Sequence, residues 1–179
     1  AVLGLLNVGH VFFGIILAVT SPAPDSASWI FIFASTVIHF GYYFLLYQSY
    51  RLGDLSMVYP IARGLSPVLV ALGAQIFAGE ALPFVAWVGV LTASGGIFLL
   101  SGNVFGGKVP LVAVAAAMGT GAMIASYSLV DGMGVRAAGS PTGYIGWLFI
   151  CEGFAAVYIF GWMGKKSFQL PRKTIALGL

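Results

Sequence analysis

The sequence predicts an all-α integral membrane protein built as a bundle of helices. Of its 179 residues, 60% are hydrophobic and only 7% are charged, against roughly 25% charged in an average soluble domain. A soluble chain of this length must cover its surface with polar groups, and this chain has too few of them. Disordered chains and disulfide scaffolds are excluded too, because 15% of the residues are aromatic and there is one cysteine.

Six segments are long and apolar enough to cross a bilayer, which requires about 20 predominantly apolar residues. They are Ala1–Thr20, Ser28–Gln48, Leu55–Ala78, Pro83–Leu100, Pro110–Val130 and Thr142–Met163. A seventh is expected to begin after Pro171. The connections are short and rich in Gly, Pro, Asn and Asp, so sequential helices should be antiparallel neighbours. Because the chain begins and ends within apolar runs, we expect a fragment of a longer protein.

The first two segments each carry a histidine near the midpoint. The first lacks a basic start and has polar residues in its apolar body, which favours a spanning helix over a signal peptide. Its residues Asn7, His10 and Gly14 share one face by their spacing. In the second segment, His39 is accompanied by Tyr42 and Tyr43.

The third segment places Tyr59, Arg63 and Ser66 on one face and contains Pro60 and Pro67. Pro67 removes a backbone donor and leaves the carbonyl of Arg63 without its usual partner. In lipid, such a group is tolerated only against protein or a watery cavity. A twice-interrupted helix with an arginine between its prolines is a candidate for a mobile, substrate-facing element. A static kink is the alternative.

The fourth and fifth segments carry small residues at the four-residue spacing that lets helix backbones approach closely. These predicted packing seams are Gly89/Ala93 and Thr92/Gly96 in the fourth segment, and Ala113, Ala117, Gly121 and Ala125 in the fifth.

The sixth segment has Glu152 near its midpoint, and Glu152 is grouped with Tyr144 and Trp147 on a polar and aromatic face. Each ionisable residue at the centre of a spanning helix costs a few kcal/mol, so such residues are candidates for function. Two structural alternatives remain open. Arg63 and Glu152 would form a buried ion pair, and each histidine would be a hydrogen-bonded packing residue.

Basic residues in the connections are biased to one side of the predicted membrane. One side has Arg136, and the other has Arg51, Lys108, Lys165, Lys166, Arg172 and Lys173. The positive-inside rule places the second side in the cytoplasm. A basic chain of this kind indicates cytoplasmic loops and no nucleic-acid partner.

Motifs for enzymatic chemistry are missing from the sequence. There is no HExxH, GxSxG or Walker loop and no Cys/His metal spacing, and the five acidic residues are dispersed. We therefore expect no enzyme, no metal and no cofactor. Two other classes stay open: a non-transporting membrane scaffold or subunit, and an intramembrane enzyme acting on lipid.

One block of the sequence carries a family resemblance. The stretch Tyr50–Val68 contains Ser66-Pro67-Val68 and is followed by Gly79-Glu80 and the glycines Gly89 and Gly95-Gly96. It resembles the EamA family of the drug/metabolite transporter superfamily. The resemblance implies a fragment of a ten-helix transporter with two inverted repeats. Residues 1–102 would be most of the first repeat, with four helices. Residues 103–179 would start the second, with two helices and the beginning of a third.

The resemblance and the mid-span polar residues together predict a secondary active transporter that exports small metabolites or drugs by alternating access. Its partners would be a small-molecule substrate, the lipid bilayer and a second copy in a homodimer, and its location the bacterial inner (plasma) membrane. The family's cytoplasmic termini would put the Lys165/Lys166 loop outside, against the charge bias. The predicted substrate path is His39, Tyr43, Tyr59, Arg63, Ser66 and Pro67, and the predicted proton-coupling residues are His10 and Glu152.

Overall fold

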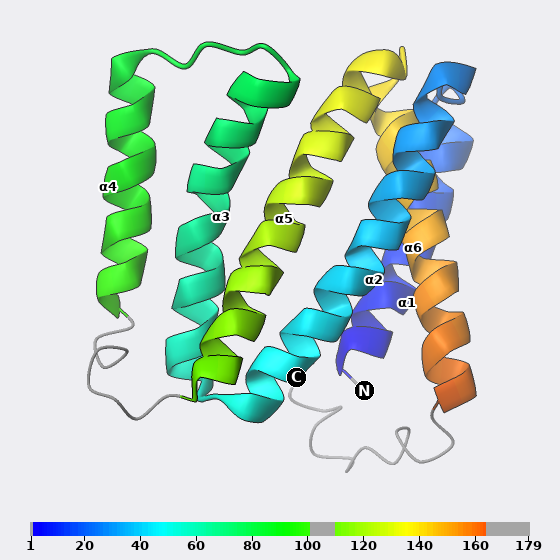
Figure 1. Cartoon of the computed structure of the whole chain (residues 1–179). Coiled ribbons are helices and arrows are strands. Elements are labelled where there is room, and N and C mark those ends of the chain that lie inside the picture. Colours follow the sequence, from blue (N-terminus) through cyan, green and yellow to red (C-terminus); the bar gives the residue numbers. More distant parts are fainter. Residues whose placement is uncertain (1, 101–109, 164–179) are drawn as a thin grey trace. The chain divides into compact units, whose positions relative to one another are not determined.

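The computed structural model describes residues 2–100 and 110–163, with side chains for 7–99, 110–154 and 157. The described chain folds into helices only, without a strand (Figure 1). These are α1 (Val2–Thr20), α2 (Trp29–Leu52), α3 (Leu55–Phe77), α4 (Phe84–Leu100), α5 (Leu111–Ala137) and α6 (Pro141–Met163), with a 3-10 turn at Ser26–Ser28 before α2. The all-α prediction is confirmed. The segment expected after Pro171, and the loop lysines, lie outside the described residues.

Two helices run beyond their predicted ends, because hydropathy marks the apolar part of a helix and not its last turn. Helix α2 continues past Gln48 to Leu52, and α5 continues past Val130 to Ala137. Each has an arginine in its last turn, Arg51 in α2 and Arg136 in α5. A positive charge is favourable there, because the C-terminal end of a helix carries a partial negative charge.

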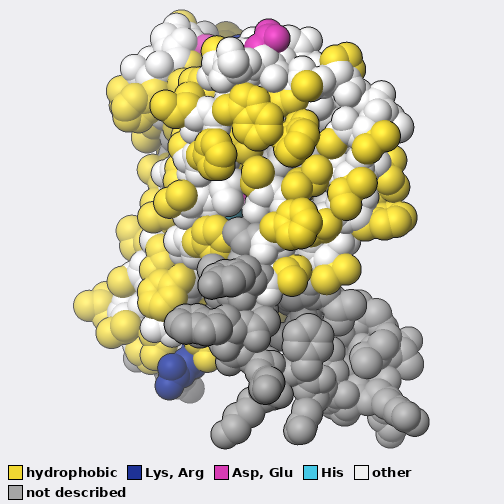
Figure 2. Space-filling view, turned by 90° about the vertical axis from the view of Figure 1, so that its right-hand side faces the viewer, with side chains coloured by type: hydrophobic (Ala, Val, Ile, Leu, Met, Phe, Trp, Pro, Cys, Tyr) yellow, Lys and Arg dark blue, Asp and Glu magenta, His cyan; other side chains and the backbone are white. Residues whose placement is uncertain are grey.

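Three helices are long and apolar enough to cross a membrane: Ser26–Leu52, Leu55–Phe77 and Leu111–Ala137. Two shorter apolar stretches, Asn7–Thr20 and Phe84–Leu99, accompany them. Figure 2 shows one face of the molecule, on which hydrophobic side chains are spread over the described surface with few charged ones. The chain is a membrane protein by these criteria. That all six helices span the bilayer remains a prediction.

The chain divides into two compact units. Unit 1 comprises Ala1–Thr36 and Gly134–Leu179, and unit 2 comprises Val37–Met133. Helices α2 and α5 contribute to both. These units are defined by which helices pack together. The predicted repeats, residues 1–102 and 103–179, are defined by sequence resemblance, and they stay a prediction.

In unit 1, α1 packs against α6 through glycines. A Cβ atom on Gly146 would lie 2.7 Å from the backbone nitrogen of Ala18, and one on Gly14 would lie 2.9 Å from the Gly146 carbonyl oxygen. A Cβ on Gly153 would lie 2.8 Å from the carbonyl oxygen of Asn7. The face of α1 that carries Asn7 and Gly14 is therefore the one that contacts α6.

In unit 2, the small-residue seam of α5 is confirmed. Ala113, Ala117 and Ala125 are buried, and a Cβ on Gly121 would lie 2.9 Å from the carbonyl oxygen of Ala62 on α3. Small side chains here let the α3 and α5 backbones approach closely.

The predicted seam on α4 is wrong for the described residues. Thr92 and Ala93 are exposed, and a Cβ on Gly89 or Gly96 would have no atom within 4 Å. Helix α4 packs on α3 through another face, where the Phe98 ring lies 3.0 Å from the Cβ position of Gly64. Spacing alone does not choose which face of an apolar helix meets its neighbour.

Candidate functional site

The polar face of α3 is open at its beginning and covered further on. Tyr59 is 46% exposed, and Arg63 is exposed with its Cζ 5.5 Å from the centroid of the Tyr59 ring. This distance is typical of a cation–π contact. Ser66, predicted to share the face, is buried with 6% of its surface exposed. The open part of the face therefore ends between Arg63 and Ser66.

Ser66 has a structural role at the proline. Both Pro60 and Pro67 lie inside α3, which continues through them as one helix. Pro67 has no N–H to donate to the carbonyl of Arg63. The hydroxyl of Ser66 donates to that carbonyl oxygen at 3.3 Å instead. The hydroxyl thus satisfies the backbone group that the proline frees.

Four aromatic side chains of α2 and α5 form a second polar group in unit 2, which we call the aromatic cluster: His39, Tyr42, Tyr43 and Tyr127. The His39 ring stacks on Tyr127, with centroids 4.0 Å apart and planes inclined by 26°. Tyr42 approaches Tyr127 edge-on at 5.9 Å and lies 5.3 Å from Tyr43. All four side chains are partly buried, so each keeps one side accessible.

The aromatic cluster lies within electrostatic reach of the open face of α3. Arg63 and Tyr59 are both electrostatic neighbours of Tyr42, and both are also neighbours of Tyr50 near the end of α2. A guanidinium group, several phenol hydroxyls and an imidazole therefore gather in unit 2. Arginine offers a planar fork of donors that suits an anionic group, and the rings offer apolar contact.

Tyr127 is the member of this group that sequence reasoning missed. The predicted end of the fifth segment at Val130 places Tyr127 close to a helix end, where a tyrosine is expected to belong to the interface belt. Because α5 continues to Ala137, Tyr127 lies well inside the helix. A helix end assigned from caps and Gly139, rather than from hydropathy, would have found it.

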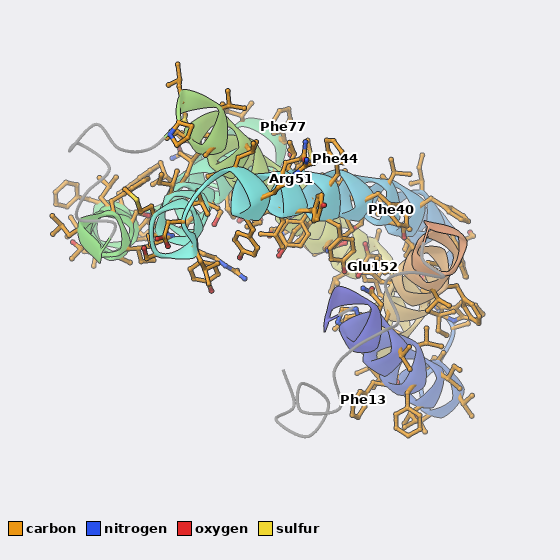
Figure 3. All side chains as sticks on the ribbon, turned by 90° about the horizontal axis from the view of Figure 1, so that it is seen from below. Phe13, Phe40, Phe44, Arg51, Phe77 and Glu152 are labelled. Carbon is orange, nitrogen blue, oxygen red and sulfur yellow. The ribbon has the colours of Figure 1, made fainter. Side chains whose placement is uncertain are left out.

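In unit 1 the structure brings the two predicted proton-coupling residues together. The Nδ1 atom of His10 lies 3.9 Å from Oε2 of Glu152. The Glu152 side chain is 3% exposed and that of His10 is 36% exposed. The His10 ring stacks on Phe149 at 4.8 Å, with the planes inclined by 12°. Figure 3 shows Glu152 between α1 and α6, whereas Phe13 points away from α6.

Glu152 is thus paired with His10 in unit 1, and Arg63 lies over Tyr59 in unit 2. Tyr144 and Trp147 belong to an apolar core instead, where Tyr144 packs with Ile32 and Trp147 lies 5.1 Å from Trp29. Within the described ranges, no three His, Cys, Asp or Glu side chains are grouped so as to hold a metal ion.

Comparisons with known protein families, with curated proteins and with solved structures found no match to this chain. The resemblance to the EamA family therefore stands on the residues quoted for it.

Proposed function

We propose that this chain belongs to a secondary active transporter that exports small metabolites or drugs by alternating access. The EamA resemblance supports this proposal. So does the lack of any nucleotide-binding motif in the sequence, because a transporter without one must draw on a gradient of protons or substrate.

The observation that carries the proposal is the gathering of polar and aromatic groups in unit 2. Arg63, Tyr59 and the aromatic cluster lie in helices that are apolar enough to span a membrane. Polar groups in such helices are costly unless they contact protein, water or a ligand. Arg63 would bind an anionic part of the substrate, and the tyrosines its less polar part.

Arg63→Ala tests this role. We expect export by the full-length protein in cells to fall to background, because the anion contact is lost, while the amount in the membrane stays unchanged. Arg63→Lys should retain only part of the activity, since an ammonium group lacks the planar fork.

Arg51→Ala is the matched control, because Arg51 is an exposed arginine at the end of α2. Its export should equal that of the wild type. Wild-type export by Arg63→Ala would refute the assignment of Arg63. Failure of the purified wild-type protein to transport any of a panel of labelled amino acids, sugars and drugs into liposomes would favour a scaffold instead.

A further inference from the structure

We propose that His10 and Glu152 form a single proton-binding site, in which the Glu152 carboxylate carries the proton and His10 delivers it. This inference rests on the proposed function, since a gradient-driven transporter needs a group that binds and releases the coupling ion. It assigns different roles to the two residues, and it places the proton site in unit 1, while the substrate contacts lie in unit 2.

Glu152 occupies a position where its charge is expensive. It lies near the midpoint of α6 and is 3% exposed, in the seam where the α1 and α6 backbones meet at glycines. An ionised side chain at the centre of a membrane helix costs about 2.5–3.5 kcal/mol on insertion scales. This cost falls if the carboxylate takes up a proton or if a cation lies beside it. His10 is able to give a proton to the carboxylate, and as an imidazolium it is also a neighbouring cation.

The His10 ring is buried between α1 and α6 at its Nδ1 atom and is exposed elsewhere. Its Nδ1 atom is buried, faces Glu152 and makes no hydrogen bond with the described part of the chain. The side chain is nevertheless 36% exposed, so the rest of the ring reaches the surface of the helix pair. Stacking on Phe149 holds the ring in this orientation. An imidazole is suited to this role because it accepts a proton on one nitrogen and releases one from the other.

The proton transfer balances without any further reactant. A proton binds Nε2 of a neutral His10 that carries hydrogen on Nδ1, and the resulting imidazolium releases its Nδ1 proton to Oε2. The products are a neutral imidazole and a neutral carboxylic acid. The present Nδ1–Oε2 distance of 3.9 Å must shorten to about 2.6–3.2 Å for transfer, or one water must bridge it.

In the described part of unit 1, few other titratable groups lie near this pair. Cys151 is the direct neighbour of Glu152 on α6 and is coupled to it electrostatically. The Asp25 carboxylate lies beside Gly139, and the Asp25 backbone N–H donates to the carbonyl oxygen of Ala138 at the α5–α6 turn. Arg136 is in the last turn of α5, and the part of α2 in this unit has no charged residue. His10 is therefore the base that faces Glu152 from α1.

Two transport assays on the full-length protein in liposomes separate coupling from substrate binding. One measures uptake driven by a pH gradient, and the other measures exchange of labelled for unlabelled substrate without a gradient. Glu152→Gln should lose gradient-driven uptake and keep exchange. His10→Phe should do the same, although phenylalanine preserves the stacking on Phe149. A packing role for His10 predicts instead that His10→Phe matches the wild type in both assays, which would overturn the proposal.

Infrared difference spectra after a pH jump test the proton site without transport. The wild type should show a carboxyl signal that Glu152→Gln lacks. In His10→Phe the signal should develop more slowly by about a hundredfold, within the range that a positioned proton-transfer group contributes. An unchanged rate would refute the role of His10, and a signal that persists in Glu152→Gln would refute that of Glu152. If no variant and no wild type transports, the proposed function fails while these spectra still decide the proton site.

Discussion

At the scale of single residues, unit 2 is organised around Tyr127 and Tyr42. Tyr127 stacks on the His39 ring at 4.0 Å. Tyr42 approaches Tyr127 edge-on and is also within electrostatic reach of Arg63 and Tyr59. Neither tyrosine is among the predicted path residues, yet both make ring contacts with His39, which is. Aromatic pairs of this kind contribute about 0.5–1.5 kcal/mol beyond the area that they bury.

Tyr127→Ala is expected to weaken substrate binding, because His39 loses the ring that orients it. The apparent KM for export should rise about two- to tenfold, the equivalent of one aromatic pair. Tyr127→Phe keeps the stacked ring and should stay close to the wild type. Equal KM values for Tyr127→Ala and the wild type would separate the aromatic cluster from the substrate path.

At the scale of helices, contact between backbones distinguishes the α1–α6 pair from α4. Glycines of α1 and α6 face each other at distances that exclude a Cβ atom, whereas Gly89 on α4 has open space around it. The same amino acid therefore has opposite consequences in two helices. In the first it permits packing, and in the second it only lowers the intrinsic stability of the helix.

Gly146→Ala should destabilise the protein, because the new Cβ would lie 2.7 Å from the nitrogen of Ala18 and 3.0 Å from the Cβ of Leu17. Overpacking of this kind typically costs about 1–3 kcal/mol. Gly89→Ala is the matched control and should be neutral or stabilising, since alanine favours a helix by about 1 kcal/mol over glycine. Thermal unfolding in detergent checks both. Equal effects of the two substitutions would contradict the close approach of α1 and α6.

The turn between α2 and α3 carries a pH-sensitive cap. Asp54 precedes α3 and accepts hydrogen bonds from the backbone N–H of Ser56 at 3.0 Å and from its hydroxyl at 2.9 Å. These bonds hold the pKa of the Asp54 carboxyl below its usual value. A lowered pKa means that the cap stabilises the folded state above the usual aspartate pKa, and that this contribution is lost as the pH falls through the lowered value.

Asp54→Asn should therefore remove that acid-sensitive contribution, because asparagine caps a helix without titrating. The two proteins should differ least near neutral pH, and the variant should lose less stability in acid. Unfolding temperatures measured from neutral to acidic pH give the comparison. Parallel curves over the whole range would show that the cap is insensitive to pH.

At the scale of the whole molecule, the basic residues of the connections predict an orientation in the membrane, and Arg51 is one of six on the predicted cytoplasmic side. Arg51 lies in the last turn of α2, and the loop before Trp29 has no basic residue. The positive-inside rule then places the α2–α3 turn in the cytoplasm and the α1–α2 loop outside. Counting helices from the cytoplasmic termini of the EamA family gives the opposite orientation.

Single cysteines distinguish the two orientations, after Cys151, the one native cysteine, is replaced by alanine. Ala23→Cys and Leu55→Cys both lie at exposed positions on either side of α2. We expect a membrane-impermeant maleimide to label Ala23→Cys in intact cells, and Leu55→Cys only after permeabilisation. The reverse labelling pattern would support the orientation obtained by counting helices in the EamA family over the orientation predicted by the positive-inside rule.

Several features were accessible from the sequence because they depend on neighbouring residues alone. Apolar runs predicted the helices, the spacing of alanines predicted the buried seam of α5, and Pro67 predicted the carbonyl of Arg63 as a group in need of a partner. Hydropathy failed at the ends of α2 and α5, since polar last turns are helical without being apolar. Spacing failed on α4, since small residues only permit a close contact.

The sequence by itself determined that this chain is a helical membrane protein and that His10, Arg63 and Glu152 lie inside apolar segments. Only the tertiary structure decided which of them meet. Glu152 is paired with His10, Arg63 lies over Tyr59, and Tyr127 joins His39. The physical reason is that hydropathy and helical spacing fix the face on which a side chain lies. Its partner is set by which helices pack together, and that depends on contacts between residues far apart in the chain.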